Sequence, residues 1–307
     1  MSSEARFAVP IAMIVFNRPD LTRRVFEKVA AARPETLLLV ADGPRPGRAG
    51  EAERVAEVRA IVQQVDWPCR VLMNFAETNM GCRRRVASGI SWVFEQVSEA
   101  IILEDDCLPA PAFLGFCRDM LERYRNDRRV FAISGTNFTN EDTEPGHYFS
   151  NFSLMWGWAT WADRWQRYVE EPNDAGQVIA ERWPGQVLRQ LFWRKTLSRV
   201  LLPEHGTWDW QWILTVWREG GLAVRPTRNL VQNIGFGPDA THTHSAEARA
   251  SKLEVFPLVM SFSDGPTDVA PDWRRDKIDE QIWAGISWKN LLAMYAPWLV
   301  DLRNRLR

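Results

Sequence analysis

The chain has 307 residues, with 38 basic and 39 acidic side chains and a formal net charge of -1. This length suffices for one large domain or for two intimately packed ones with a sizeable core. Because the charge is balanced, we expect no nucleic-acid partner, since proteins that bind nucleic acids usually carry a surplus of basic residues.

The cysteines and the N-terminal sequence both bear on the cellular compartment. The four cysteines are Cys69, Cys82, Cys107 and Cys117. They have no CxxC spacing and lie in or beside apolar runs, which favours reduced thiols over disulfides or a zinc site. The apolar run at 9–16 is too short to span a membrane and carries no signal-peptide cleavage pattern. We therefore expect a cytoplasmic protein.

The first 135 residues alternate between short apolar runs and segments with helical periodicity. The apolar runs, typical of strands covered on both faces, are 9–16, 36–42, 69–75, 100–103 and 130–134. We expect Asp20 to be the N-cap of the helix after the first run. A further helix is expected from about 51 to 65. This alternation predicts an α/β fold, a mostly parallel sheet with helices on both faces.

From about Tyr148 the composition changes, because the chain's 16 tryptophans are concentrated between Trp156 and Trp217. Most should be core residues, and the alternative for the cluster is stacking on sugar rings. We expect a first half over 1–147, a smaller Trp-rich subdomain over 148–250, and a C-terminal helical extension over 251–307.

The last stretch, 287–307, is apolar with basic residues at its end. We expect it to be a packed terminal helix. The alternative is a peripheral membrane contact through this segment, which would make the protein membrane-associated.

Polar side chains follow several of the predicted strands, at the edge of the sheet where ligands bind in folds of this kind. They are Asn17 and Arg18, Asp42, the stretch 79–85, and Glu104 with Asp105 and Asp106. Three adjacent carboxylates suit a hard divalent cation such as Mn²⁺ or Mg²⁺, which commonly binds one or two carboxylates together with substrate phosphates. The alternative is a solvated acidic turn that caps the helix starting near Pro109.

Five segments resemble GT-A type glycosyltransferases, and most closely the N-acetylglucosaminyltransferase I family. IILEDDCLPAPAFLGF (101–116) resembles the EDD metal motif of these enzymes, running into a PxF helix start. The other four are PIAMIVFNRPDLTRRVFEKV (10–29), SLMWGWATW (153–161), TWDWQW (207–212) and VRPTRNLVQNIGFG (224–237). The likeness spans about 9–245 in the right order. The chain departs from that family in lacking a membrane anchor.

The resemblance implies metal-dependent transfer of a sugar from a nucleoside-diphosphate sugar, expected to be UDP-linked, to a glycan or glycolipid acceptor, as in polysaccharide biosynthesis. Residues 1–147 would bind the donor and 148–250 the acceptor. Asp106 would coordinate Mn²⁺ or Mg²⁺, while Glu104 and Asp105 would hold ribose or sugar hydroxyls. The remaining implied nucleotide contacts are Asn17 and Arg18 in the pocket, Asp42 on the base, and Arg85 facing the diphosphate.

Asp209 lies between Trp208 and Trp210, and the resemblance implies that it is the catalytic base of an inverting transfer. An acid flanked by indoles loses hydration, which raises its proton affinity toward that of a general base. The alternative is a helix N-cap, because an apolar run follows. We further expect 237–245 to be a flexible lid over the donor, whose His242 and His244 could bind metal or meet the diphosphate.

Two other classes of protein compete with this hypothesis. A sugar-nucleotide nucleotidyltransferase would share the sheet and the acids, but it should carry a glycine-rich basic loop where this chain has NRPDL (17–21). A non-catalytic carbohydrate-binding protein would explain the tryptophans, yet it has no need for the three adjacent carboxylates.

Overall fold

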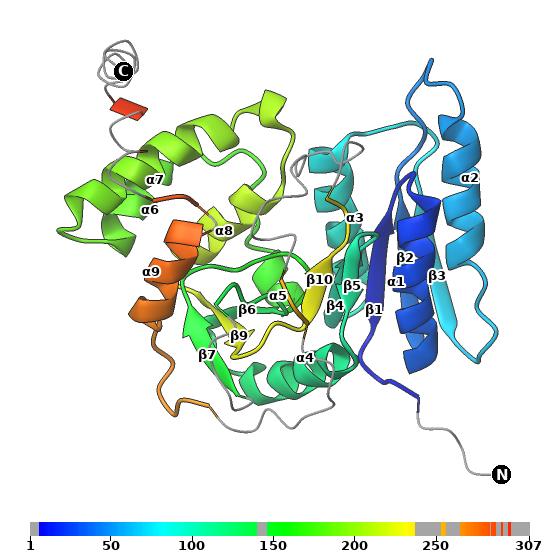
Figure 1. Ribbon diagram of the computed structural model, residues 1–307, viewed down its shortest axis with the longest axis horizontal. Helices are drawn as coiled ribbons and strands as arrows, with labels where there is room; N and C mark the ends of the chain where they lie inside the picture. Colours follow the sequence, from blue (N-terminus) through cyan, green and yellow to red (C-terminus); the bar gives the residue numbers. More distant parts are fainter. Residues whose placement is uncertain are drawn as a thin grey trace.

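The centre of the structure, a computed structural model, is an eight-stranded mixed sheet with the order β3-β2-β1-β4-β8-β6-β9-β7 (Figure 1). The structure describes residues 6–139, 146–236, 253–255, 265–282, 284–286, 290 and 294–295. The strands of the sheet are β1 (Ile11–Val15), β2 (Thr36–Ala41), β3 (Arg70–Phe75), β4 (Glu99–Glu104), β6 (Val130–Ser134), β7 (His147–Ser150), β8 (Trp158–Trp161) and β9 (Leu222–Pro226). Only β7 and β8 run against the other six.

Helices cover both faces of this sheet, which confirms the predicted α/β class. The helices are α1 (Pro19–Ala32), α2 (Glu51–Val62), α3 (Cys82–Gln96), α4 (Pro111–Tyr124), α5 (Ala162–Trp165), α6 (Ala175–Arg182), α7 (Val187–Val200), α8 (Asp209–Arg218) and α9 (Trp273–Ile282), with a 3₁₀ turn at Pro203–His205. Alternate side chains of each strand enter opposite cores. Ile11 and Met13 pack with α1, α2 and α4, whereas Ala12 and Ile14 pack with α3, α5 and α8.

Two details differ from the expectations. Helix α1 begins at Pro19, which is favoured in the first helical turn, so the expectation that Asp20 is the N-cap was wrong. Strand β8 lies between β4 and β6, although both neighbours precede it in the chain. The segment after Tyr148 therefore contributes strands to the same sheet as the first half.

The tryptophan-rich region is mostly core. Its buried indoles are Trp158, Trp161, Trp165, Trp183, Trp193, Trp208, Trp212 and Trp217. Trp183, Trp193 and Trp217 form a separate apolar cluster between α6, α7 and α8. Only Trp156 and Trp210 in this region keep partial exposure, so sugar stacking can be sought at these two.

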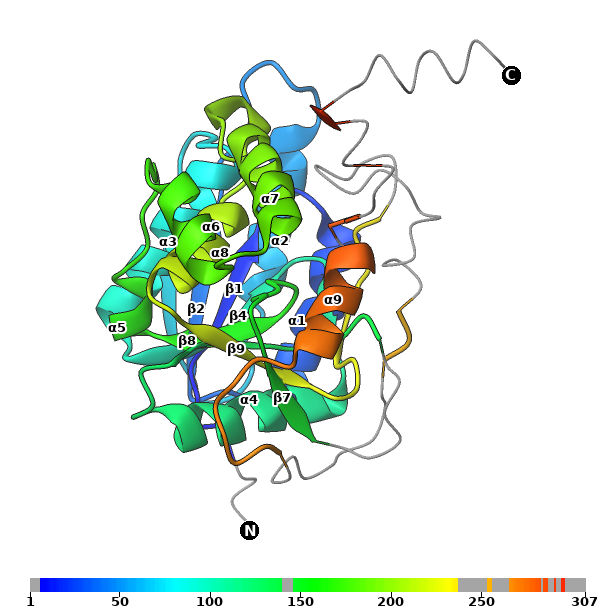
Figure 2. The same ribbon diagram turned by 90° about the vertical axis from the view of Figure 1, so that its left-hand side faces the viewer.

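Helix α9 is attached to the sheet through three buried carboxylates, which we call the α9 triplet: Asp276, Asp279 and Glu280. Asp276 accepts hydrogen bonds from Ser150 and Asn151. Asp279 pairs with Arg225, and Glu280 accepts from Arg189 and Trp193. Figure 2 shows α9 beside β7 and below α7. Each acid of this triplet is thus bonded to a different part of the second half of the chain.

The structure contains a second, very small sheet near the end of β4. It pairs β5 (Cys107–Pro109) with β10 (Val231–Asn233) in antiparallel register. This pairing brings the segment after β10 across the residues that follow β4.

In the part of the chain that the structure describes, no helix has both the length and the apolar composition that a bilayer crossing requires. The C-terminal stretch 287–307 is described only at Asn290, Met294 and Tyr295, so its expected terminal helix lies outside the described residues.

Candidate active site

Three adjacent carboxylates at the carboxyl end of β4 share a single arginine; we call Glu104, Asp105 and Asp106 the β4 triplet. Arg18, between β1 and α1, forms ion pairs with Asp105 and with Asp106, in the second case with Nη1 3.0 Å from Oδ2. The Cys107 thiol lies 3.5 Å from Oδ1 of Asp106. The side chain of Asp105 is 4% exposed and that of Asp106 is 14% exposed, so a ligand reaches Asp106 more readily.

The charge of the β4 triplet is only partly compensated. Burial, reinforced by Asp106 and Asp105, raises the pKa of Glu104 well above its usual range, and no described group donates a hydrogen bond to its carboxylate. Burial also raises the pKa of Asp105 despite Arg18. Burial lowers the pKa of Arg18, but the charges of Asp105 and Asp106 outweigh this effect and raise it. Arg18 therefore pairs with only two of the three acids, and a further cation would be stabilised here.

Asp209 belongs to the same site. After burial and the other two acids, its charge is a further cause of the raised pKa of Glu104. Burial raises the pKa of Asp209 itself, and its Oδ1 is buried without a hydrogen-bond partner. The structure places Trp208 at the N-cap of α8 and starts the helix at Asp209, so the alternative of an N-cap role for Asp209 was wrong.

Cys82 is a site residue that sequence reasoning did not single out. It is the first residue of α3 and is half-buried. Burial, followed by the charges of Glu104 and Asp209, raises the pKa of its thiol. Cys82 therefore lies near both acids as a neutral thiol. Its position within the polar stretch 79–85 at a strand end was the available signal.

Asp42 lies at the same edge of the sheet, at the end of β2, but both its oxygens already accept hydrogen bonds. Oδ1 accepts from the backbone N–H groups of Gly43 and Met80, and Oδ2 from Nδ2 of Asn79 at 3.0 Å and from N–H of Gly81. Asp42 thus fixes the loop that starts α3. A contact with a nucleobase would have to replace some of these bonds.

Asn17 is tied to Glu51, the first residue of α2, which sequence reasoning missed. Asn17 Nδ2 donates to Glu51 Oε1 at 3.0 Å, and the backbone N–H of Arg45 donates to Oε2 at 2.7 Å. The side-chain hydrogen bond from Arg45 lowers the pKa of Glu51 to about 2, although burial opposes it. Glu51 therefore stays ionised and holds the loop after β2 in place.

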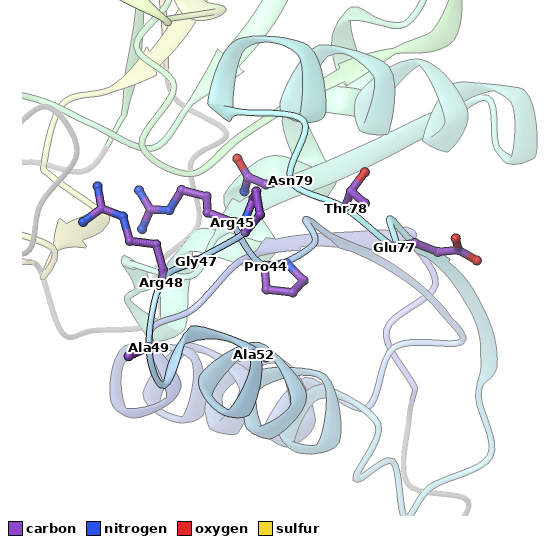
Figure 3. A pocket seen from close by; sticks show the side chains of 10 residues that line it. Pro44, Arg45, Gly47, Arg48, Ala49, Ala52, Glu77, Thr78 and Asn79 are labelled. Atoms are coloured by element: carbon purple, nitrogen blue, oxygen red, sulfur yellow. The ribbon is translucent and has the colours of Figure 1, made fainter.

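A pocket of about 730 Å³ opens beside this loop. It is lined by Pro44, Arg45, Pro46, Gly47, Arg48, Ala49, Ala52, Glu77, Thr78 and Asn79. Figure 3 shows the side chains of Arg45 and Arg48 extending from the loop in the same direction. The pocket shares Asn79 with the loop fixed by Asp42, and its volume is in the range that small-molecule sites occupy.

Arg85 has a different position from the one implied by the resemblance. It is buried, and Nε donates to the carbonyl of Ala41 at 3.2 Å while Nη2 donates to Asn74 Oδ1 at 2.9 Å. Burial lowers its pKa. The hydrogen bonds of Arg85 are made to the ends of β2 and β3, so the structure does not bring it to the β4 triplet.

The chain after β10 passes directly over Asp106. The N–H of Ile234 donates to the carbonyl of Asp106 at 2.8 Å, and a Cβ added at Gly235 would lie 2.8 Å from Cβ of Asp106. Only glycine fits this crossing. Phe236 then packs on the half-buried Trp156, with ring centroids 5.8 Å apart. The expected lid at 237–245, with His242 and His244, lies outside the described residues.

The residues present fit a hard cation held jointly with a ligand. Among the described residues, no group of three or more His, Cys, Asp or Glu is arranged as a metal cage. Mg²⁺ and Mn²⁺ do not require one, because they commonly bind one or two carboxylates and complete their shell with phosphate oxygens and water. The partly exposed carboxylate of Asp106 matches that chemistry.

Comparison with known proteins gave structural likenesses only. No protein-family model matches the chain, and no curated protein does. UDP-glucose pyrophosphorylase complexed with UDP-glucose aligns at 9% identity over 71% of this chain and 89% of the other, with a TM-score of 0.35. Mannose-1-phosphate geranyltransferase from Thermus thermophilus aligns at 13% identity, over 73% and 76%, with a TM-score of 0.36. Mouse xyloside xylosyltransferase 1 aligns at 10%, over 68% and 81%, with a TM-score of 0.32. Likenesses this loose carry no argument about function.

Proposed function

We propose that the chain is a glycosyltransferase that moves a sugar from a nucleoside-diphosphate sugar, expected to be UDP-linked, to a hydroxyl of a glycan or glycolipid. One arrangement at the sheet edge carries this proposal. Arg18 compensates the charge of the β4 triplet only in part, and Asp209, a partly buried acid with a raised pKa, lies near Glu104. The resemblance of five sequence segments to GT-A type glycosyltransferases supports it.

In this proposal the donor occupies the sheet edge between the pocket and the β4 triplet. The nucleoside lies in the pocket beside Arg45 and Asn79, and the diphosphate extends toward Arg18 and Asp106. Arg18 exchanges carboxylate oxygens for phosphate oxygens, which suit its fork of donors equally well. A Mg²⁺ or Mn²⁺ ion held by Asp106 would neutralise charge on the leaving diphosphate. Residues 237–245 would then cover the donor.

Asp209 is proposed as the general base. Its Oδ1 accepts the proton of the acceptor hydroxyl, the acceptor oxygen bonds to the anomeric carbon, and the bond from that carbon to the diphosphate breaks. Attack opposite the leaving group inverts the configuration. Glu104 keeps its proton to an unusually high pH, so it can donate a hydrogen bond to a sugar hydroxyl, while Asp105 accepts one. Trp156 and Trp210 offer partly exposed faces to the acceptor.

A nucleotidyltransferase is the second candidate, because it would use the same acids and pocket. The loop between β1 and α1 argues against it. That loop is short, contains no glycine, and its arginine, Arg18, is already paired with the β4 triplet. A triphosphate therefore finds no backbone cradle after β1.

The two reactions release different products. The protein is incubated with a panel of nucleoside-diphosphate sugars and Mn²⁺, and free nucleoside diphosphate is measured. In parallel, sugar 1-phosphates and nucleoside triphosphates are supplied and pyrophosphate is measured. We expect nucleoside diphosphate from one donor and no pyrophosphate. Pyrophosphate release would instead establish the nucleotidyltransferase, and the absence of both products would favour a non-catalytic carbohydrate-binding protein.

Replacement of Asp106 tests the assignment of the cation. Asp106→Asn keeps the size of the side chain and should leave the free energy of unfolding close to that of the parent, because Asp105 still pairs with Arg18. Mn²⁺-dependent binding of the nucleoside diphosphate, measured by calorimetry, should be lost. If the variant binds the diphosphate and Mn²⁺ as tightly as the parent, Asp106 does not hold the metal.

A further inference from the structure

Helix α7 has an outward face that is apolar over its first half. Phe192, Trp193 and Leu197 point into the core, whereas Val187 is 63% exposed, Leu188 45% and Leu191 38%. Leu202, just after the helix, is 44% exposed. Elsewhere in the described chain, large exposed apolar side chains are scattered singly, so this cluster is unusual for the molecule.

The second half of the same face is basic. The stretch 183–203 contains four basic residues and no acidic one; they are Arg189, Arg194, Lys195 and Arg199. Arg189 is paired with Glu280, but the other three are exposed and none forms an ion pair with any described carboxylate. A run of this length without an acid leaves a locally positive surface on a chain whose overall charge is balanced.

Two aromatic side chains extend the patch beyond α7. Trp273, the first residue of α9, is 50% exposed and stacks on the guanidinium of Arg189 at 5.4 Å. Tyr295 is 50% exposed and donates a hydrogen bond to the carbonyl of Leu191 at 2.7 Å. Figures 1 and 2 both place α7 and α9 side by side, and Figure 1 shows them at the end of the molecule far from α1 and α2.

We propose that this surface, the α7 face defined by Val187, Leu188, Leu191, Lys195 and Arg199, docks on an anionic phospholipid bilayer. Helices that lie in the membrane interface combine an exposed apolar stripe with lysine and arginine, and flanking tryptophan and tyrosine are favoured at the same depth. A two-fold dimer through this face would bring two positively charged surfaces together without an acidic residue of 183–203 to compensate them, which is unfavourable.

This inference does not rest on the proposed reaction, because none of these residues belongs to the candidate active site. It adds to that proposal, however, since an enzyme held at a bilayer surface meets acceptors that are anchored there. Membrane docking through α7 is also distinct from the peripheral contact considered as the alternative for residues 287–307, which lie almost entirely outside the described chain.

Vesicle co-sedimentation of the full chain tests the inference without donor or acceptor. We expect the parent to bind phosphatidylglycerol-containing vesicles, to release them as salt increases, and to bind pure phosphatidylcholine vesicles poorly. Leu188→Glu/Leu191→Glu and Lys195→Glu/Arg199→Glu should each reduce the partition coefficient by about 10-fold or more. The matched control is Arg70→Glu/Met73→Glu, which changes an exposed basic and an exposed apolar residue on the edge strand β3.

The folded state of each variant is checked by its thermal unfolding, and Leu188→Ala/Leu191→Ala replaces the first pair if that variant is unstable. The proposal is overturned if the parent does not bind anionic vesicles, or if the α7 variants bind like the parent. It is also overturned if the parent is a dimer by analytical ultracentrifugation that Leu188→Glu/Leu191→Glu dissociates. Release of nucleoside diphosphate is assayed separately, so a failure here leaves the proposed reaction intact.

Discussion

The molecule contains two triplets of largely buried carboxylates that differ in how they are compensated. In the α9 triplet every acid has its own donor: Asp279, for example, is paired with Arg225, and both side chains are 0% exposed. In the β4 triplet, Arg18 serves two acids and Glu104 has no described donor. Burying a charge without a partner is costly, and a fold tolerates it only where something else supplies the compensation.

This difference in compensation indicates that the two triplets have different roles. The α9 triplet stabilises the docking of a C-terminal helix, so its carboxylates are already satisfied. The β4 triplet keeps unsatisfied acceptor capacity beside a pocket, so it is suited to a ligand that brings positive charge. Replacements in the first triplet should therefore change stability, and replacements at the candidate site should change function.

The largest expected effect is on turnover, at Asp209. Asp209→Asn keeps the shape of the side chain but cannot accept a proton from the acceptor. Turnover should fall by a factor on the order of 10² to 10⁴, the usual contribution of a positioned general base, while donor affinity and the free energy of unfolding stay near the parent values. Initial rates of transfer measure turnover, and calorimetric donor titrations measure donor affinity. Near-normal turnover would exclude Asp209 as the base. The next acids of the second half to test would be Asp163, which pairs with Arg128 and Arg164, and Asp239, which lies outside the described residues.

Asp279→Ala should have the largest effect on stability. It leaves the guanidinium of Arg225 buried without its partner, which typically costs about 3–5 kcal/mol. Urea unfolding of the parent and the variant measures the difference. The double variant Arg225→Leu/Asp279→Leu removes both charges and should recover much of the loss. A loss below about 1 kcal/mol for the single variant would mean that the pair behaves like an exposed one.

The contribution of Asp276, in the α9 triplet, to the free energy of unfolding should depend on pH. Burial raises its pKa to about 6, although Ser150 and Asn151 oppose the shift. The folded state therefore keeps this proton to a higher pH than the unfolded chain does. Its contribution to stability is complete below about pH 4 and is lost as the pH rises through about 6. Relative to Asp276→Asn, the parent should lose about 2 kcal/mol of unfolding free energy between about pH 4 and pH 7. A difference that stays constant with pH would contradict this.

Of these substitutions, Glu104→Gln should change stability least, and it should stabilise the folded state, whereas Asp279→Ala should destabilise it. Because burial and the neighbouring acids raise the pKa of Glu104 well above its usual range, ionising it at high pH disfavours the folded state. The neutral amide should therefore raise the free energy of unfolding by about 1 kcal/mol at alkaline pH, and by less in acid where Glu104 is protonated. Thermal unfolding across pH checks the sign. A destabilised variant at alkaline pH would mean that Glu104 is compensated by an unseen partner.

The sequence predicted the elements of the first half well, because buried parallel strands appear as continuous apolar runs such as TLLLVA (36–41). It also located the edge at which Arg18 pairs with Asp105 and Asp106, but it assigned Asp209 to a separate subdomain. It did not predict the position of β8, since strand order depends on pairing between distant segments. The α9 triplet was missed for a similar reason: WRRDKIDEQI has the composition of a solvated helix until Arg225 is placed against it.

Within the candidate site, the sequence identified residues better than it predicted their contacts. Asp42 follows a strand as expected, yet its hydrogen bonds depend on the conformation of the loop before α3. Arg85 is one of three consecutive arginines, and only the rotation of α3 decides which of them faces the sheet. These assignments are set by tertiary packing, which a local pattern does not encode.

The insertion of β8 between β4 and β6 has a consequence for how the chain acquires its fold on the ribosome. Strand β6 emerges before β8 but is not paired with β4, so the edge of β4 stays open until residues 158–161 have been made. A nascent chain or fragment that stops at residue 147 would expose that hydrogen-bonding edge. The β4 triplet and Asp209 come from opposite sides of this insertion, so we expect the first half, produced alone, to associate through that open edge rather than to fold as an independent module.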